Sequence, residues 1–136
     1  MALLDTTVLI DLTRRAGHPQ RARAEAVTRR LLSAGEPLLT SRINEAEFRV
    51  GPLRAADATR EAAKVEAVLA TLVVLDFDAA AAVRFAEAQA HLLGTGRPAG
   101  EMDVLIAAVA LANGQSIVTR NPEDFVEIRG LVIEAY

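Results

Sequence analysis

Carboxylate side chains follow short apolar segments or open helical segments at several places in this chain. Asp5 follows Ala2-Leu3-Leu4, and Asp76 follows the apolar segment 72–75. The acidic residues that open predicted helices are Glu45, Glu47, Glu101, Asp103 and Asp124. Such hard oxygen donors are the ligands that Mg²⁺ and Mn²⁺ prefer. Where several of them meet they repel one another, so some must hold a proton or share a cation. A cation held in this way activates water and clamps a phosphodiester.

Short apolar segments alternate with helical segments along the whole chain. Strands are expected at 3–6, 38–40, 72–75, 116–119 and 131–133. Helices are expected at 7–14, 20–34, 41–50, 55–71, 78–93 and 101–113, with a short one after Asn121 and with Gly51-Pro52 ending the third. This alternation predicts a single domain over residues 1–136, a three-layer α/β/α sandwich with a mainly parallel sheet of four to five strands. Ligands of such sheets bind beyond the carboxyl ends of the strands, near a topological switch point.

The composition excludes several other kinds of site. The chain has 136 residues, a net charge of -3 and no cysteine, which excludes disulfides and thiolate metal sites. His18 and His91 stand alone, whereas a zinc hydrolase needs clustered ligands. No P-loop, dinucleotide fingerprint or G-x-S-x-G motif is present. With no apolar run of 18 residues and no basic leader, we expect a cytoplasmic protein without a membrane span.

Each candidate residue also has a purely structural explanation. Asp5 could cap the helix that follows it, and Asp103 could complement a helix dipole. Asn121 is a sound N-cap ahead of Pro122. Because these residues recur at one edge of the predicted sheet, their joint occurrence favours a shared metal site over separate caps.

Three motifs in order along the chain resemble those of the PIN-domain ribonucleases, especially VapC-type toxins of bacterial toxin–antitoxin pairs. The first is Leu3-Leu4-Asp5-Thr6-Thr7-Val8-Leu9-Ile10, and the second is the segment 44–51, Asn-Glu-Ala-Glu-Phe-Arg-Val-Gly. The third begins with the segment 103–110, Asp-Val-Leu-Ile-Ala-Ala-Val-Ala, and continues with Gly114 and the segment 117–125. Together the motifs cover almost the whole chain, and their order and spacing make the resemblance specific.

The resemblance implies roles for individual residues. Asp5, Glu47 and Asp103 match the family's metal-binding acids, whereas Glu45, two positions before Glu47, should point elsewhere on its helix. Asn121 falls where the family often has a fourth acid, and it is expected as the fourth catalytic residue, orienting a water on the metal. Two consequences of this amide stay open: a weaker second metal site, or a charge supplied by Asp124 from the next turn.

Further supporting roles are expected next to these ligands. Thr6 and Thr119 are placed to hold a water or a carboxylate around the ligands, and Arg120 is a candidate phosphate contact unless it is an exposed arginine at a helix start. The implied cofactor is Mg²⁺ or Mn²⁺.

The same resemblance implies an RNA substrate, a homodimer and a cognate antitoxin. The arginine-rich stretch 14–30 and the first helices form the expected docking groove, and this stretch and the loop 94–100 are where we expect the RNA to be selected. A haloacid-dehalogenase-type phosphatase is excluded because it needs a second acid at Thr7, and a receiver domain because Lys64, the only lysine, lies mid-helix. The alternative that stays open is a non-catalytic PIN-like scaffold that binds RNA or a protein.

Overall fold

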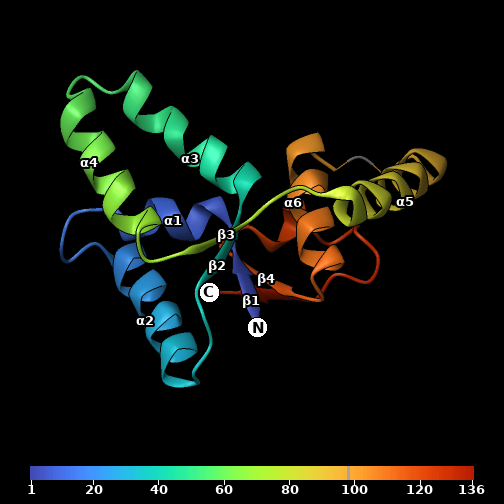
Figure 1. Ribbon diagram of the computed structural model, residues 1–136, viewed down its shortest axis with the longest axis horizontal. Helices are drawn as coiled ribbons and strands as arrows, with labels where there is room; N and C mark the ends of the chain where they lie inside the picture. Colours follow the sequence, from blue (N-terminus) through green and yellow to red (C-terminus); the bar gives the residue numbers. More distant parts are fainter. Residues whose placement is uncertain (98) are drawn as a thin grey trace.

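Five short strands form one parallel sheet in the order β3-β2-β1-β4-β5 (Figure 1). The computed structural model describes residues 1–97 and 99–136. The strands are β1 (Ala2–Leu4), β2 (Leu39–Ser41), β3 (Val73–Leu75), β4 (Ser116–Thr119) and β5 (Ile133–Ala135). The helices are α1 (Thr6–Leu12), α2 (Pro19–Ser33), α3 (Arg42–Arg54), α4 (Ala58–Leu69), α5 (Ala79–Thr95), α6 (Glu101–Ala112) and a 3₁₀ turn, η1 (Pro122–Asp124). The predicted parallel α/β architecture is confirmed.

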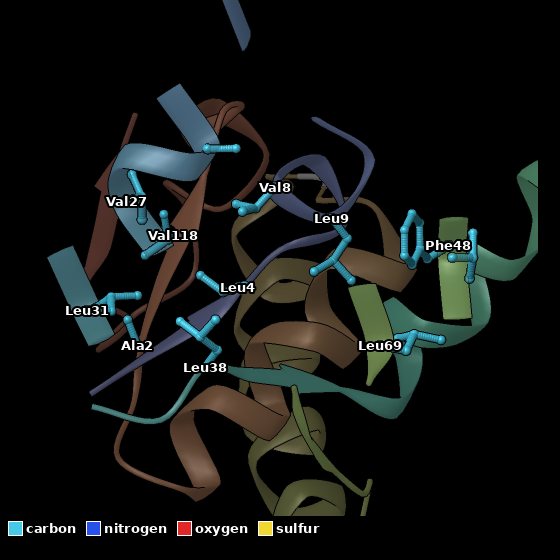
Figure 2. Packing of buried hydrophobic residues seen from close by; sticks show 12 residues of the cluster. Ala2, Leu4, Val8, Leu9, Val27, Leu31, Leu38, Phe48, Leu69 and Val118 are labelled. Atoms are coloured by element: carbon cyan, nitrogen blue, oxygen red, sulfur yellow. The ribbon is translucent and has the colours of Figure 1, made fainter. Parts of the chain in front are cut away.

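Alternate residues of the buried strands supply two separate cores. Ala2 and Leu4 of β1 pack with α1 to α4 on one face of the sheet, in the cluster that Figure 2 shows. Leu3 of β1 and Ile117 of β4 face the other way and pack against α5 and α6. Figure 1 shows the same division, with α1 to α4 on one side of the strands and α5 and α6 on the other. This alternation follows from the two-residue period of a strand and produces the three layers.

The direction in which successive strands are added to the sheet reverses between β1 and β4. From β1 the chain winds outward through β2 to β3, and it then returns to the opposite side of β1 to form β4 and β5. The carboxyl ends of β1 and β4 therefore lie side by side, and the Asp5 N–H donates to the Val118 carbonyl at 3.0 Å. This is the topological switch point at which the sequence places its acidic residues.

Several predicted boundaries are wrong. Helix α3 continues through Gly51-Pro52 to Arg54. Pro52 lacks the N–H that a helix interior needs, but Phe48 and Pro52 lie one turn apart and are both buried, and this packing carries the helix onward. Strand β5 begins at Ile133 instead of 131. Helix α5 extends to Thr95, into the predicted loop 94–100, and Pro98 of that loop lies outside the described residues. No described helix has the length and apolar character needed to cross a membrane.

A buried carboxylate on α1 ties the two ends of the chain together. Asp11 is fully buried and accepts from Arg14 Nε at 2.6 Å. It also accepts from Arg120 Nη1 at 2.6 and 2.8 Å and from the Tyr136 hydroxyl at 2.7 Å. Asp11 therefore joins α1, the residue after β4 and the C-terminal residue in one network. No local pattern in the sequence distinguishes Asp11 from the other acidic residues.

We predict that Asp11→Ala destabilises the fold strongly. The change leaves Arg14 and Arg120 without their carboxylate, and their side chains are only 34% and 28% exposed. Breaking a fully buried ion pair costs about 3–5 kcal/mol, and this partial exposure lowers the expected loss to roughly 2–4 kcal/mol. Tyr136→Phe removes one neutral donor and should cost about 1 kcal/mol. Urea denaturation measures both, and equal losses for the two variants would contradict this account of the network.

Candidate active site

Asp5 is held at the carboxyl end of β1 by neutral donors alone. Its side chain caps α1 and is 5% exposed. One carboxylate oxygen accepts from the Thr7 and Thr119 hydroxyls, both at 2.9 Å, and from the Thr7 N–H at 3.4 Å. The other accepts from Asn44 Nδ2 at 3.2 Å. A buried charge is tolerated when it is hydrogen-bonded in this way, so the carboxylate is fixed in place while its negative charge is not neutralised.

Glu47 projects from α3 toward the same place. The Thr6 hydroxyl donates to Glu47 Oε2 at 2.6 Å and in turn accepts from Asn44 Nδ2 at 2.9 Å. Burial raises the pKa of Glu47 and the negative charge of Asp5 raises it further, while the hydrogen bond from Thr6 opposes both. Glu45 lies two residues earlier on the helix and forms ion pairs with Arg42 and Arg49 instead, so it points away as expected.

Asp103 completes the cluster from the first turn of α6. Burial raises its pKa to about 6, and the charges of Asp124, Asp5 and Glu47 contribute, in that order. These like charges come from neighbouring segments, and Asp124 at the end of η1 contributes the largest of them. The role of Asp124 in supplying the charge that Asn121 lacks stays a prediction. The Asn121 N–H donates to the Thr119 hydroxyl at 3.0 Å, and the Asn121 side chain does not cap η1.

Two residues of this site lacked an assigned role in the sequence analysis. Asn44 is fully buried and links Asp5 to Thr6, and Thr7 donates to Asp5. A signal for Asn44 does exist in the sequence. Ser41 and Asn44 stand three residues apart at the start of α3, where they form a reciprocal capping box. Asn44 therefore orients α3 and donates to Asp5 at the same time.

Arg120, the expected phosphate contact, is paired with Asp11 in this structure, and its contact with a phosphate stays a prediction. Its guanidinium binds both oxygens of Asp11, while its backbone N–H donates to the Thr7 hydroxyl at 3.1 Å. Because Asp11 is fully buried and Arg120 largely so, this pairing is a structural contact. Arg120 fixes the turn after β4 and leaves the acidic pocket without a cation of its own.

The four acids Asp5, Glu47, Asp103 and Asp124, which we together call the acidic pocket, form no ion pair with any described residue. Asp5, Glu47, Asp103 and Asp124 each lack an arginine or lysine within 4.0 Å, whereas most other acids of the chain have one. Within residues 1–97 and 99–136, no three or more His, Cys, Asp or Glu side chains are arranged so that they could hold a metal ion together. Mg²⁺ usually takes one or two carboxylates and keeps several waters, so the chemistry of these oxygen donors fits it.

Comparison with known proteins assigns the chain to a family. A family model described as the PIN domain matches residues 2–131. The chain belongs to the PIN-domain family. Ribonuclease VapC2 of Haemophilus influenzae is 30% identical over 132 residues, which cover 97% of this chain and 95% of that protein. The tRNA(fMet)-specific endonuclease VapC of Shigella flexneri is 40% identical over 75 residues, and this match spans 55% of the chain but only 57% of the relative's length.

Solved structures of this PIN-domain family show the same fold. The DNA-bound VapBC complex of Salmonella typhimurium has a chain that is 30% identical, with a TM-score of 0.83 and coverage of 99% of this chain and 98% of that one. VapBC2 of Rickettsia felis, bound to a DNA fragment from its promoter, superposes with a TM-score of 0.86 at 24% identity, which supports the fold alone. The resemblance of this PIN-domain chain to VapC-type toxins is thereby confirmed.

We predict that Asp103→Asn stabilises the metal-free protein in a pH-dependent way. Because the pKa of Asp103 rises from 3.8 to about 6 on folding, the ionised carboxylate favours the unfolded chain. This cost is absent below about pH 4 and complete above about pH 6. The variant should therefore gain about 1–2 kcal/mol of unfolding free energy at pH 8 and nothing at pH 4. Denaturation in a chelator tests this, with Glu101→Gln on the exposed side of the same turn as a control that should show no gain.

Proposed function

We propose that this PIN-domain protein is a Mg²⁺- or Mn²⁺-dependent endoribonuclease and the toxin of a toxin–antitoxin pair. The observation that carries the proposal is that Asp5, Glu47 and Asp103 lie at the switch point of a parallel sheet and that the negative charge of Asp5 raises the pKa of the other two carboxyls, with no ion-pair partner among the described residues. The relatives named as ribonucleases support RNA as the substrate. The VapBC complexes among the similar structures support a protein antitoxin as partner.

The chain's own residues would divide the work as follows. Asp5, Glu47 and Asp103 would hold the metal, directly or through water, and Asp124 would add negative charge beside Asp103. When bound, Mg²⁺ or Mn²⁺ supplies activation of a water molecule and neutralisation of charge on the phosphate. Thr7 and Thr119 keep Asp5 in one orientation, and Thr6 does the same for Glu47.

The acidic pocket also suggests how an antitoxin would inhibit the proposed toxin. An antitoxin that inserts an arginine into the pocket would pair with the carboxylates and compete with the metal, a charge-complementary means of inhibition. Such an arginine would meet four acids that have no ion-pair partner in the described chain. A homodimer is part of the same proposal.

The central prediction is metal-dependent cleavage of RNA that requires the pocket acids. Purified protein should cleave bulk tRNA or mixed oligoribonucleotides with Mn²⁺ or Mg²⁺ and stop in a chelator. Asp5→Asn, Glu47→Gln and Asp103→Asn should each lower the rate by about a hundredfold or more, because each removes charge stabilisation at the reacting phosphate.

The matched control for these variants is Glu45→Gln, on the same helix as Glu47 but paired with Arg42 and Arg49. It should keep nearly full activity. A folded wild type that cleaves none of these RNAs with either metal would reject the enzyme and favour the non-catalytic scaffold.

A second prediction concerns Gly100, the residue that precedes α6. A Cβ built on Gly100 would lie 2.4 Å from Asp103 Oδ2, so a side chain there must push the carboxylate aside. Only the end of a flexible side chain has to move, and the fold should remain stable. Gly100→Ala should therefore weaken Mn²⁺ binding by about tenfold, the usual minimum for changes next to a metal ligand.

Isothermal titration with Mn²⁺ measures the effect of Gly100→Ala without any RNA. Gly94→Ala is the matched control, because an added Cβ at Gly94 would meet no atom within 4 Å. Equal Mn²⁺ affinity for the two variants would show that Asp103 does not need its present position to bind the metal.

A further inference from the structure

Five cationic side chains line a groove on the α1–α4 side of the molecule. The groove has a volume of about 480 Å³ and lies between the end of α1, the start of α2 and α4, which Figure 1 shows on the same side of the sheet. Its cations are Arg14, Arg15, Arg21, Arg60 and Lys64, and no acidic residue lines it. We call it the basic groove. Sequence reasoning pointed to the arginine-rich stretch 14–30, but only folding brings Arg60 and Lys64 of α4 to it.

Two of these cations have no carboxylate partner in the described chain. Arg14 pairs with the buried Asp11, Arg21 with Glu25, and Lys64 with Glu61. Arg15 and Arg60 are exposed, and their guanidinium groups form no ion pair with a described residue, although the Arg60 backbone N–H donates to Asp57 at 3.0 Å. The basic groove therefore keeps a positive charge that its own surroundings do not neutralise, although the chain as a whole carries -3.

The acidic pocket and the basic groove lie at opposite ends of one short helix. Asp5 caps the start of α1, and Leu12, Thr13 and Arg14 at its other end line the groove. The seven residues of α1 span about 10 Å at 1.5 Å per residue. A polyanion that passes the acidic pocket needs cations nearby, and Arg120 is paired with Asp11 in this structure.

We propose that the basic groove binds the phosphodiester backbone of the RNA substrate on one side of the cleavage site. Guanidinium groups bind phosphate in a two-pronged manner, and such contacts fix the position of a strand without reading its sequence. The guanidinium groups of Arg15 and Arg60, unpaired among the described residues, together with the lack of acidic residues in the lining, favour a polyanion over a peptide as occupant. The proposal rests on the proposed nuclease function, since it concerns that enzyme's substrate.

The test uses RNA binding to a protein that does not cleave. In an Asp103→Asn background with Mg²⁺ present, the affinity for a fluorescent 20-residue oligouridylate is measured by anisotropy over a range of salt concentrations. The double variant Arg15→Gln/Arg60→Gln should bind about tenfold more weakly at low salt. Its slope of log affinity against log salt should be smaller by about 1.4, for two lost contacts to single-stranded phosphate. Thermal unfolding checks that the fold is retained.

The matched control is Arg54→Gln/Arg129→Gln, which removes two exposed arginines outside the basic groove and gives the same net charge. Equal affinity and slope for the two double variants would overturn the proposal. It would equally be overturned if Arg15→Gln/Arg60→Gln kept its RNA affinity but lost binding to the protein encoded by the adjacent gene, because the groove would then be a protein docking surface.

The nuclease function is judged separately, by cleavage with the wild-type protein. A wild type that cleaves while both double variants bind alike rejects the groove alone. A wild type that never cleaves, together with a specific loss of binding in Arg15→Gln/Arg60→Gln, rejects the nuclease and supports the groove as a nucleic-acid site.

Discussion

Repulsion among like charges at the end of a parallel sheet is the constraint on which this structure depends. Asp5, Glu47, Asp103 and Asp124 come from four different segments, and folding brings these segments to one edge of the sheet. Burial and the charges of Asp124, Asp5 and Glu47 raise the pKa of Asp103 to about 6. Asp5 and Glu47 are held by hydroxyl and amide donors, which leave their oxygens without an ion-pair partner among the described residues, as the proposed metal site requires.

The chain meets this constraint by separating two kinds of hydrogen-bond donor. Hydroxyl and amide groups of Thr6, Thr7, Asn44 and Thr119 surround the pocket acids and fix them without neutralising them. The guanidinium groups nearby are bound to other carboxylates. Arg120 is held by Asp11, one to two turns along α1 from Asp5, and Arg42 by Glu45 and Asp76. Ion pairs between arginines and carboxylates stabilise the surroundings of the acidic pocket. An ion pair of the same kind with a pocket acid would block the proposed metal site.

Much of this arrangement can be read from the sequence, because it depends on local patterns. The short apolar strands, the caps Asp5, Ser41 and Asp78, and the acids at strand ends follow from periodicity and residue type. Contacts that depend on distant packing cannot be read in this way. The partnership of Arg120 with Asp11 joins residues 109 positions apart, and the passage of α3 through Pro52 depends on packing that the helix finds only in the folded chain.

Negative and positive side chains lie at opposite ends of α1. At the N-terminal end of this helix a carboxylate is kept free of cations, and at its C-terminal end Arg14 and Arg15 stand over a groove without acids. Asp11, between the two, is what allows this arrangement, since it binds Arg14 and Arg120 and so limits how far positive charge reaches toward Asp5. A phosphodiester strand lying along such a helix would be attracted at one end and would meet the pocket acids at the other only together with a cation. One buried carboxylate thus lies between the groove proposed to bind RNA and the acids proposed to support its cleavage.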